Sequence, residues 1–197
     1  MSRIRSRHRQ EPHPSSRGGA ARRSGPLPGS PPVRAAGRER LIRPLRDGDA
    51  PHIPDLAATS RELEWIFPGL PYPLRPPWLA GALAACPETT VCAEGGRVVG
   101  LAALRDPHPG GEAFIEHLAV HPERRCRGLG THLLRSLLLR AFQYYRCHEV
   151  HARVSSDNMP ATLFFYEAGF LPYGIDGVDG RGTVLRLRLG RRDLDEG

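Results

Sequence analysis

The chain has 197 residues, 40% of them apolar and 25% charged, which suits one globular domain. It has no apolar run of about 18 residues, so a membrane-spanning helix is excluded. The formal net charge of +7 would favour a polyanionic partner if that charge belonged to the folded part.

The positive charge lies before residue 41. Residues 1–40 hold ten Arg and two Glu, a charge of +8, whereas residues 41–197 hold 18 Arg and 19 acidic residues, a charge of −1. The first segment has no aromatic residue and few aliphatic ones, so we predict a disordered, solvated tail. Its prolines and glycines disfavour a transit peptide, and its lack of stacking aromatics disfavours a nucleic-acid arm. A translation start further along the chain is another interpretation.

The four cysteines, Cys86, Cys92, Cys126 and Cys147, form no C-x-x-C pair and no zinc-ligand spacing. They indicate reduced thiols, and the N-terminus has no apolar secretory signal. We therefore expect a cytoplasmic protein with no membrane partner. A nucleic-acid partner is disfavoured by the tail's lack of aromatic residues.

Strands and helices are predicted in alternation from Leu41 onward. The first elements are a strand over 41–45, a helix from Asp47 or Asp49 to about Ser60, an irregular aromatic and Pro-rich loop over 62–77 and a short helix over 78–85. Strands over 89–93 and 97–104 follow around a Gly95-Gly96 turn, and then a strand over 112–120. The last elements are an amphipathic helix from Gly128, a strand over 150–154, a helix from Asp157 or Asn158 to Gly169, and a strand over 184–189. This order predicts a single α/β domain with a mixed sheet, followed by a short charged tail over 191–197.

The segment after Val120 joins a strand to the amphipathic helix through an Arg- and Gly-rich turn. The first N–H groups of a helix have no partner within it, and the helix dipole adds positive potential there. Gly128 and Gly130 lack Cβ atoms where a phosphate would approach the backbone, and Arg125 and Arg127 add charge. The sequence therefore predicts an anion site.

Two other nucleotide-binding motifs fail at this turn. A dinucleotide fingerprint needs a third glycine where Leu133 stands, and a Walker loop needs a lysine, which the chain lacks.

These residues resemble the GNAT superfamily of acetyl-CoA-dependent N-acetyltransferases. R-C-R-G-L-G at 125–130 matches the family's R/Q-x-x-G-x-G/A loop, after a Leu-Ala-Val-x-Pro strand end. The positions Asn158, Ala161, Glu167 and Gly169-Phe170 resemble the family's N-x-x-A…Y-E…G-F helix, and 42–47 resembles its first strand. The resemblance covers residues 41–190 and implies one domain with a central, mostly antiparallel sheet flanked by helices.

The resemblance implies acetyl-CoA as co-substrate and no metal. The backbone N–H groups from Cys126 to Thr131 would hold the pyrophosphate, and the strand edge at 118–120 would pair with the pantetheine arm. Asn158 would contact the cofactor or orient the backbone beside it. The implied cofactor-binding residues are Leu118, Ala119, Val120, Arg125, Cys126, Arg127, Gly128, Leu129, Gly130, Thr131 and Asn158.

The resemblance also implies direct transfer of the acetyl group to a primary amine in a ternary complex. Glu116 is the candidate base, and strand alternation would place it on one face with Leu118 and Val120, leaving His117 opposite as a weaker candidate. The family's tyrosine acid falls on Phe165 here, with Tyr166 one place later. Either Tyr166 serves as the acid, or water protonates the thiolate.

The acceptor would be a small-molecule or peptide amine. The residues expected around it are Glu62, Glu64, Trp65, Phe67, Tyr72, Trp78, Tyr173, Asp176 and Asp179. His148 and His151 lie three apart on a strand and would face opposite sides, which argues against a metal site between them. Cys126 is interpreted as a loop residue rather than a nucleophile.

Two other functions remain open. One is a regulatory acyl-CoA-binding domain of the same fold that has lost catalysis, which the Phe165 departure favours. The other is a nucleic-acid-associated protein acting through its Arg-rich tail. A homodimer is compatible with either the enzyme or the regulatory domain.

Overall fold

The structure is a computed structural model that describes residues 40–178 and 182–191. The predicted tail over 1–40 lies outside this range except for Arg40, and the C-terminal tail lies outside it except for Arg191. Seven strands form one sheet in the order β1-β2-β3-β4-β5-β7-β6. They are β1 (Arg40–Pro44), β2 (Glu88–Glu94), β3 (Arg97–Arg105), β4 (Glu112–Val120), β5 (Glu149–Ser155), β6 (Leu171–Val178) and β7 (Gly182–Gly190). Only the β4–β5 pair is parallel.

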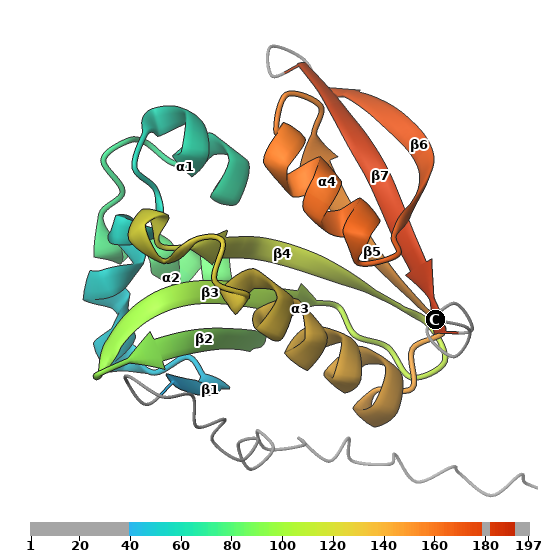
Figure 1. Ribbon diagram of the computed structural model, residues 1–197, viewed down its shortest axis with the longest axis horizontal. Coiled ribbons are helices and arrows are strands. Elements are labelled where there is room, and N and C mark those ends of the chain that lie inside the picture. The colour runs from blue at the N-terminus through green and yellow to red at the C-terminus, as the bar shows by residue number, and fades with distance from the viewer. Residues whose placement is uncertain (1–39, 179–181, 192–197) are drawn as a thin grey trace, which may run out of the picture.

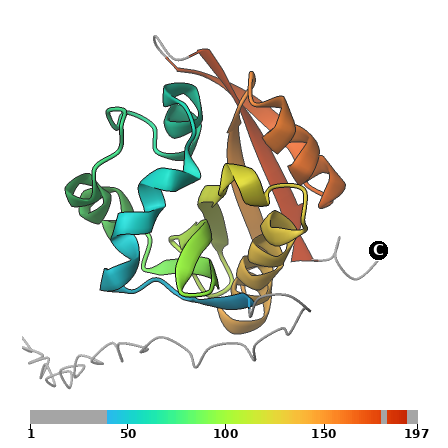
Figure 2. The same ribbon diagram turned by 60° about the vertical axis from the view of Figure 1, so that its left-hand side comes forward.

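Helices cover both faces of this sheet (Figures 1 and 2). The 3-10 helix η1 (Asp47–Leu56), α1 (Ser60–Ile66) and α2 (Pro76–Ala84) pack on one face of β2–β4. On the other face lie α3 (Leu129–Leu139), which continues into the π-helical turn η3 (Arg140–Tyr144), and α4 (Met159–Glu167). A short 3-10 turn, η2 (Pro122–Arg124), precedes α3.

Each helical layer has its own apolar core. The leucine stripe of α3 (Leu129, Leu133, Leu134, Leu137) is buried against the sheet, as its helical spacing predicts. On the opposite face, Ile53, Leu63, Phe67 and Leu79 pack onto Val91 and Leu101. The predicted fold class, a mixed and mostly antiparallel sheet flanked by helices, is therefore confirmed.

The prediction of one helix from Asp47 to Ser60 is wrong. The segment forms η1, which contains Pro51 and Pro54, and a separate helix α1 begins at Ser60. Proline has no N–H to donate and clashes with the preceding turn, so a regular α-helix cannot pass through two of them. Thr59 then caps α1 by accepting the N–H of Glu62 at 3.1 Å. The segment over 62–66, expected as an irregular loop, is therefore helical.

Strand β6 was not predicted. Its Pro172 and two glycines, Gly174 and Gly177, are poor strand formers, but β6 is an edge strand that pairs only with β7. The other expected strands and the Gly95-Gly96 turn, with positive φ at both glycines, are present. Within the described residues, no helix is both long and apolar enough to cross a bilayer.

Candidate active site

Strands β4 and β5 diverge halfway along their length (Figure 1). They pair from Glu112 with Glu149 to Ile115 with Ala152, after which β5 pairs only with β7 and β4 only with β3. A cleft of about 600 Å³ opens at this divergence, and its walls come from α1, β3, β4, β5, α4 and β7. The divergence exposes one edge of β4 from residue 116 to residue 120.

A β-bulge lies where the strands part. Leu101 pairs with Ala119 and Ala103 with Glu116, so His117 and Leu118 together face Ala102. His117 has a φ of +54°, the left-handed region that an alternating strand does not use. The bulge reverses the alternation: Ile115 before it and Leu118 after it both pack against the α3 core.

The prediction that Glu116, Leu118 and Val120 share one face is therefore wrong. Leu118 and Val120 pack against the α3 core, whereas Glu116 alternates with the core residue Ile115. The extra residue in β4 breaks the period of two. Nevertheless, Glu116, His117 and Leu118 all line the cleft.

The free edge of β4 presents the backbone of alternate residues. The His121 N–H donates to the Val99 carbonyl at 2.9 Å, so His121 and Ala119 turn their backbone groups toward β3. The backbone groups of Leu118 and Val120 consequently face away from β3, toward the cleft side. Of the three residues predicted to pair with an extended ligand, Leu118 and Val120 offer the hydrogen-bonding groups.

The predicted anion loop begins α3. Cys126 and Gly128 have φ of +57° and +75°, and Gly128 is the N-cap residue. The His132 N–H donates to the Gly128 carbonyl at 3.0 Å, which makes Leu129, Gly130 and Thr131 the first turn of the helix. N–H groups in a first turn have no carbonyl of their own helix to bind. Arg127 beside them is exposed and has no charged partner among the described residues.

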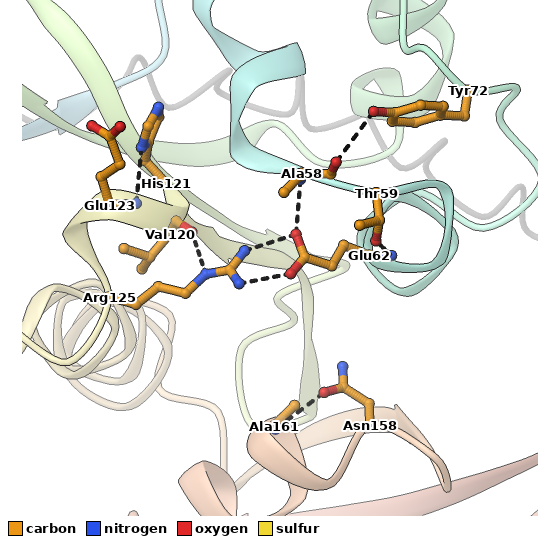
Figure 3. A network of polar contacts seen from close by, with 10 residues as sticks. All are labelled: Ala58, Thr59, Glu62, Tyr72, Val120, His121, Glu123, Arg125, Asn158 and Ala161. Carbon is orange, nitrogen blue, oxygen red and sulfur yellow. Dashed lines mark hydrogen bonds and ion pairs between the residues drawn. The ribbon is translucent and has the colours of Figure 1, made fainter.

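Arg125 does not offer a free charge to this loop. Its two terminal nitrogens donate to the two carboxylate oxygens of Glu62 at 2.7 and 2.9 Å, and its Nε donates to the Val120 carbonyl at 3.1 Å (Figure 3). The hydrogen bond from Arg125 lowers the pKa of Glu62, and the same bond raises the pKa of Arg125. The pair ties α1 to the loop before α3 and occupies the last carbonyl of the free β4 edge.

Asn158 caps α4. Its side-chain oxygen accepts the Ala161 N–H at 3.2 Å, and Asn158 and Ala161 both line the cleft (Figure 3). Asn158 was expected either to contact the cofactor or to orient the backbone beside it. This hydrogen bond orients the backbone at the start of α4.

Glu116 and His117 have different partners in the cleft wall. Glu116 accepts a hydrogen bond from Arg105 Nε at 3.1 Å, and Arg105 also binds Asp106 at 2.6 Å. His117 stacks on Phe67 with ring centroids 4.5 Å apart, and its Nδ1 lies 2.7 Å from the Ile66 carbonyl oxygen. Because a carbonyl can only accept, Nδ1 carries the proton and Nε2 of the neutral ring keeps its lone pair.

The cleft receives Phe165 rather than Tyr166. Phe165 lines the cleft and is 5% exposed, whereas the Tyr166 side chain, one place further around α4, is 41% exposed and lies outside the lining. Within the described residues, no tyrosine hydroxyl reaches this cleft. The geometry therefore does not bring Tyr166 together with the other predicted site residues.

The residues expected around the acceptor divide into two groups. Glu64 and Trp65 line the cleft, whereas Phe67 and Trp78 pack in or against the core and Tyr72 binds the Ala58 carbonyl outside it. Tyr173 and Asp176 lie on β6 and contact residues of β5 and β7 instead, and Asp179 lies outside the described residues.

Sequence reasoning missed three arginines in the cleft wall. Arg61 on α1, Arg105 on β3 and Arg153 on β5 line it, and each is ion-paired, with Asp157, Glu116 and Asp176 respectively. Trp65 also donates to Asp157 at 3.1 Å, so α1 is joined across the cleft to the turn before α4. No local sequence signal marks these pairs, because each arginine and its carboxylate belong to different elements of the fold.

The family model for the Acetyltransferase (GNAT) family matches residues 56–170 of the chain. The chain belongs to this family. None of the curated protein sequences compared with it matches.

Solved structures of other GNAT acetyltransferases have the same fold. The spermidine N-acetyltransferase of Vibrio cholerae, in complex with CoA and spermine, is 20% identical with a TM-score of 0.63, and the match covers 78% of this chain and 96% of that one. The aminoglycoside acetyltransferase AAC(6')-Ib, in complex with coenzyme A, is 19% identical (TM-score 0.62; 80% and 98% covered). Ard1 from Thermoplasma volcanium is 20% identical (TM-score 0.64; 77% and 97% covered). At these identities the likeness concerns the fold.

Proposed function

We propose that this GNAT protein transfers an acetyl group from acetyl-CoA to a primary amine by direct attack in a ternary complex. The observation that carries the proposal is the meeting of two half-sites at the β4 bulge. The glycine loop follows the free β4 edge in the chain, and Glu116, His117 and Leu118 of that edge line a cleft that could take a second molecule.

The cofactor half uses backbone more than side chains. The N–H groups from Cys126 to Thr131 would bind the pyrophosphate, as first-turn N–H groups bind anions. Leu118 and the Val120 N–H would pair with the pantetheine amides, while the Val120 carbonyl is already held by Arg125. This predicts that the arm pairs mainly at Leu118, close to the bulge.

The amine must lose a proton to attack the thioester. Two groups at the bulge could accept it, and we propose His117, because its Nδ1 is already committed to Ile66 and Nε2 is free to take a proton. Glu116, the candidate from the sequence, is held by Arg105 and would position that arginine in the cleft wall.

These two roles differ in the pH dependence of kcat/KM. If His117 is the base, the acidic limb disappears in His117→Asn and persists in Glu116→Gln. Loss of the limb in Glu116→Gln alone would return the role to Glu116.

The departing thiolate needs no tyrosine in this account. Free thiols have pKa values of about 8.5, so a thiolate is a good leaving group and water can protonate it. Phe165 at the family's tyrosine position is compatible with this route, since it leaves the sulfur without a protein acid.

The acceptor half has walls of mixed charge. Glu64 and Glu116 line the cleft, and so do Arg61, Arg105 and Arg153. A polycation would meet these arginines, whereas an amine that carries its own carboxylate would find a partner for both ends. We therefore propose an amino acid or a peptide as acceptor.

Matched pairs of amines test this assignment. Free CoA is measured as thiol release with lysine against cadaverine, and with amino acids against their amides. Higher kcat/KM for the carboxylate-bearing member supports the proposal, and a preference for cadaverine contradicts the acceptor class. Binding of acetyl-CoA without turnover on any amine would instead favour the regulatory acyl-CoA-binding domain.

A further inference from the structure

Three potential metal ligands gather away from the cleft, where β4 and β5 are still paired. Glu112 on β4 lies directly opposite Glu149 on β5, and His151 follows two residues later on the same face. Val150 and Ala152, which alternate with Glu149 and His151 along β5, face the α3 core. The three potential ligands therefore lie on the other side of the sheet.

The three side chains converge on one point. His151 Nε2 lies 2.9 Å from Glu149 Oε2 and 3.5 Å from Glu112 Oε2, and the three ligand atoms lie within 4.8 Å of one another. Ligands of a tetrahedral zinc ion, bound at about 2.0–2.2 Å, stand roughly 3.3–3.6 Å apart. The separation of 3.5 Å between His151 and Glu112 lies in that range, and the separation of 2.9 Å between His151 and Glu149 is shorter.

His151 is buried, and its Nε2 makes no hydrogen bond with any residue that the structure describes. The side chain is 6% exposed, and although two carboxylate oxygens are near Nε2, neither satisfies hydrogen-bond geometry. The other ring nitrogen, Nδ1, lies 2.8 Å from the Tyr173 hydroxyl. A metal-ligating histidine commonly has its second nitrogen fixed in this way, which sets the tautomer and the ring orientation.

The surroundings leave the group anionic. Two glutamates face each other across the strands, which is unfavourable for like charges, and of the nearby arginines Arg188 reaches only Glu149 Oε1, at 3.5 Å. Phe114 and Tyr173 pack against the His151 ring and limit the solvent around it. The two carboxylates of the cluster outnumber the one arginine beside them.

We propose that Glu112, Glu149 and His151 bind a divalent transition-metal ion, with zinc as the best match to one imidazole and two carboxylates. Water would complete the coordination on the side of Glu112, whose side chain is 48% exposed. The ion would neutralise the facing glutamates and clamp β4 to β5 at the closed end of the divergence. From the sequence, His148 was considered as a second ligand beside His151. In the fold, Glu112 from the neighbouring strand β4 lies beside His151 instead.

Cobalt absorption provides a direct test on the untagged full chain. His8 and His13 are replaced by alanine so that residues before the described range add no histidine ligand. We expect one Co²⁺ per chain, with visible absorption bands of a low-coordinate site that Zn²⁺ abolishes by displacement.

Glu112→Gln is the informative variant, because its half-exposed side chain can change without disturbing the core. Loss of this ligand should weaken Co²⁺ binding by at least about tenfold, and Tyr173→Phe should weaken it by about tenfold through the second nitrogen of His151. A matched control removes the same carboxylate at an exposed position elsewhere, Glu167→Gln, and should bind as the parent does.

The proposal is overturned if the parent shows no such bands, or if Glu112→Gln binds Co²⁺ as tightly as Glu167→Gln does. In either case the cluster is not a metal site. Neither result depends on acetyl transfer.

Discussion

The ion pair between Glu62 and Arg125 should stabilise the folded state measurably. These residues are 63 positions apart and join α1 to the loop before α3 through two hydrogen bonds. We propose a double-mutant cycle with Glu62→Gln and Arg125→Gln. Glutamine keeps an acceptor for the Ala58 N–H, which Glu62 binds at 2.8 Å, so the cycle isolates the charged contact.

The magnitude follows from geometry and exposure. A hydrogen bond to a charged group contributes about 1.5–3 kcal/mol when it is well shielded from water. The Arg125 side chain is 40% exposed and that of Glu62 19%, so solvent screening reduces the coupling for the pair to about 1 kcal/mol. For a domain of this size, that energy moves Tm by about 2–4 °C.

The coupling should depend on pH in one direction. The contact with Arg125 lowers the pKa of Glu62 below its ordinary value of 4.5. A carboxyl with a depressed pKa contributes stability that is complete above its unfolded value and is lost as the pH falls through its folded value. The coupling free energy from urea unfolding should therefore be complete at neutral pH and decrease as the pH falls below 4.5 through the lowered pKa of Glu62.

The exposed pair Arg97–Asp55 is a matched control. It is joined by one hydrogen bond of 2.7 Å, with side chains 56% and 47% exposed, so its coupling should be smaller than that of Glu62 with Arg125. A Glu62–Arg125 coupling within about 0.3 kcal/mol of zero at neutral pH would show that this ion pair does not stabilise the folded state. A coupling that acidification leaves unchanged would show that it does not depend on the charge of Glu62.

Three further substitutions test the site. Gly128→Ala should destabilise the protein by about 1–2 kcal/mol in thermal unfolding, because Gly128 has a φ of +75°. Gly130→Ala should destabilise it less, because the added Cβ would meet Phe164 at an ordinary contact distance of 3.4 Å. Tyr166→Phe should leave kcat unchanged, and a large loss would restore the tyrosine acid. Arg127→Gln should weaken acetyl-CoA binding measured by calorimetry, with the largest effect at low salt, and an unchanged affinity would remove Arg127 from the cofactor site.

Local patterns accounted for much of the fold and for the glycine loop before α3. The glycine loop could be predicted because all its parts, a strand end, Gly128 and an amphipathic helix, are adjacent in the chain. The leucine stripe and the Gly95-Gly96 turn are local in the same sense. The prolines at 51 and 54 also carried a local signal, which should have ended the first predicted helix.

The missed features depend on contacts between distant segments. The bulge at His117 follows from how β4 pairs with β3, and its φ of +54° leaves no mark in the sequence. Because of this bulge, Glu116 does not share a face of β4 with Leu118 and Val120, as the alternation had predicted. Arg125 was predicted to serve a phosphate, but its partner Glu62 comes from a helix that the sequence did not predict.

Acetyl transfer to an amine can be measured by incubating the purified chain with acetyl-CoA and a panel of primary amines and following free CoA together with the mass of the amine. We expect CoA release and a mass gain of one acetyl group per amine to occur together, and His117→Asn to slow both. Saturable binding of acetyl-CoA with no acetylated product from any amine would contradict this expectation.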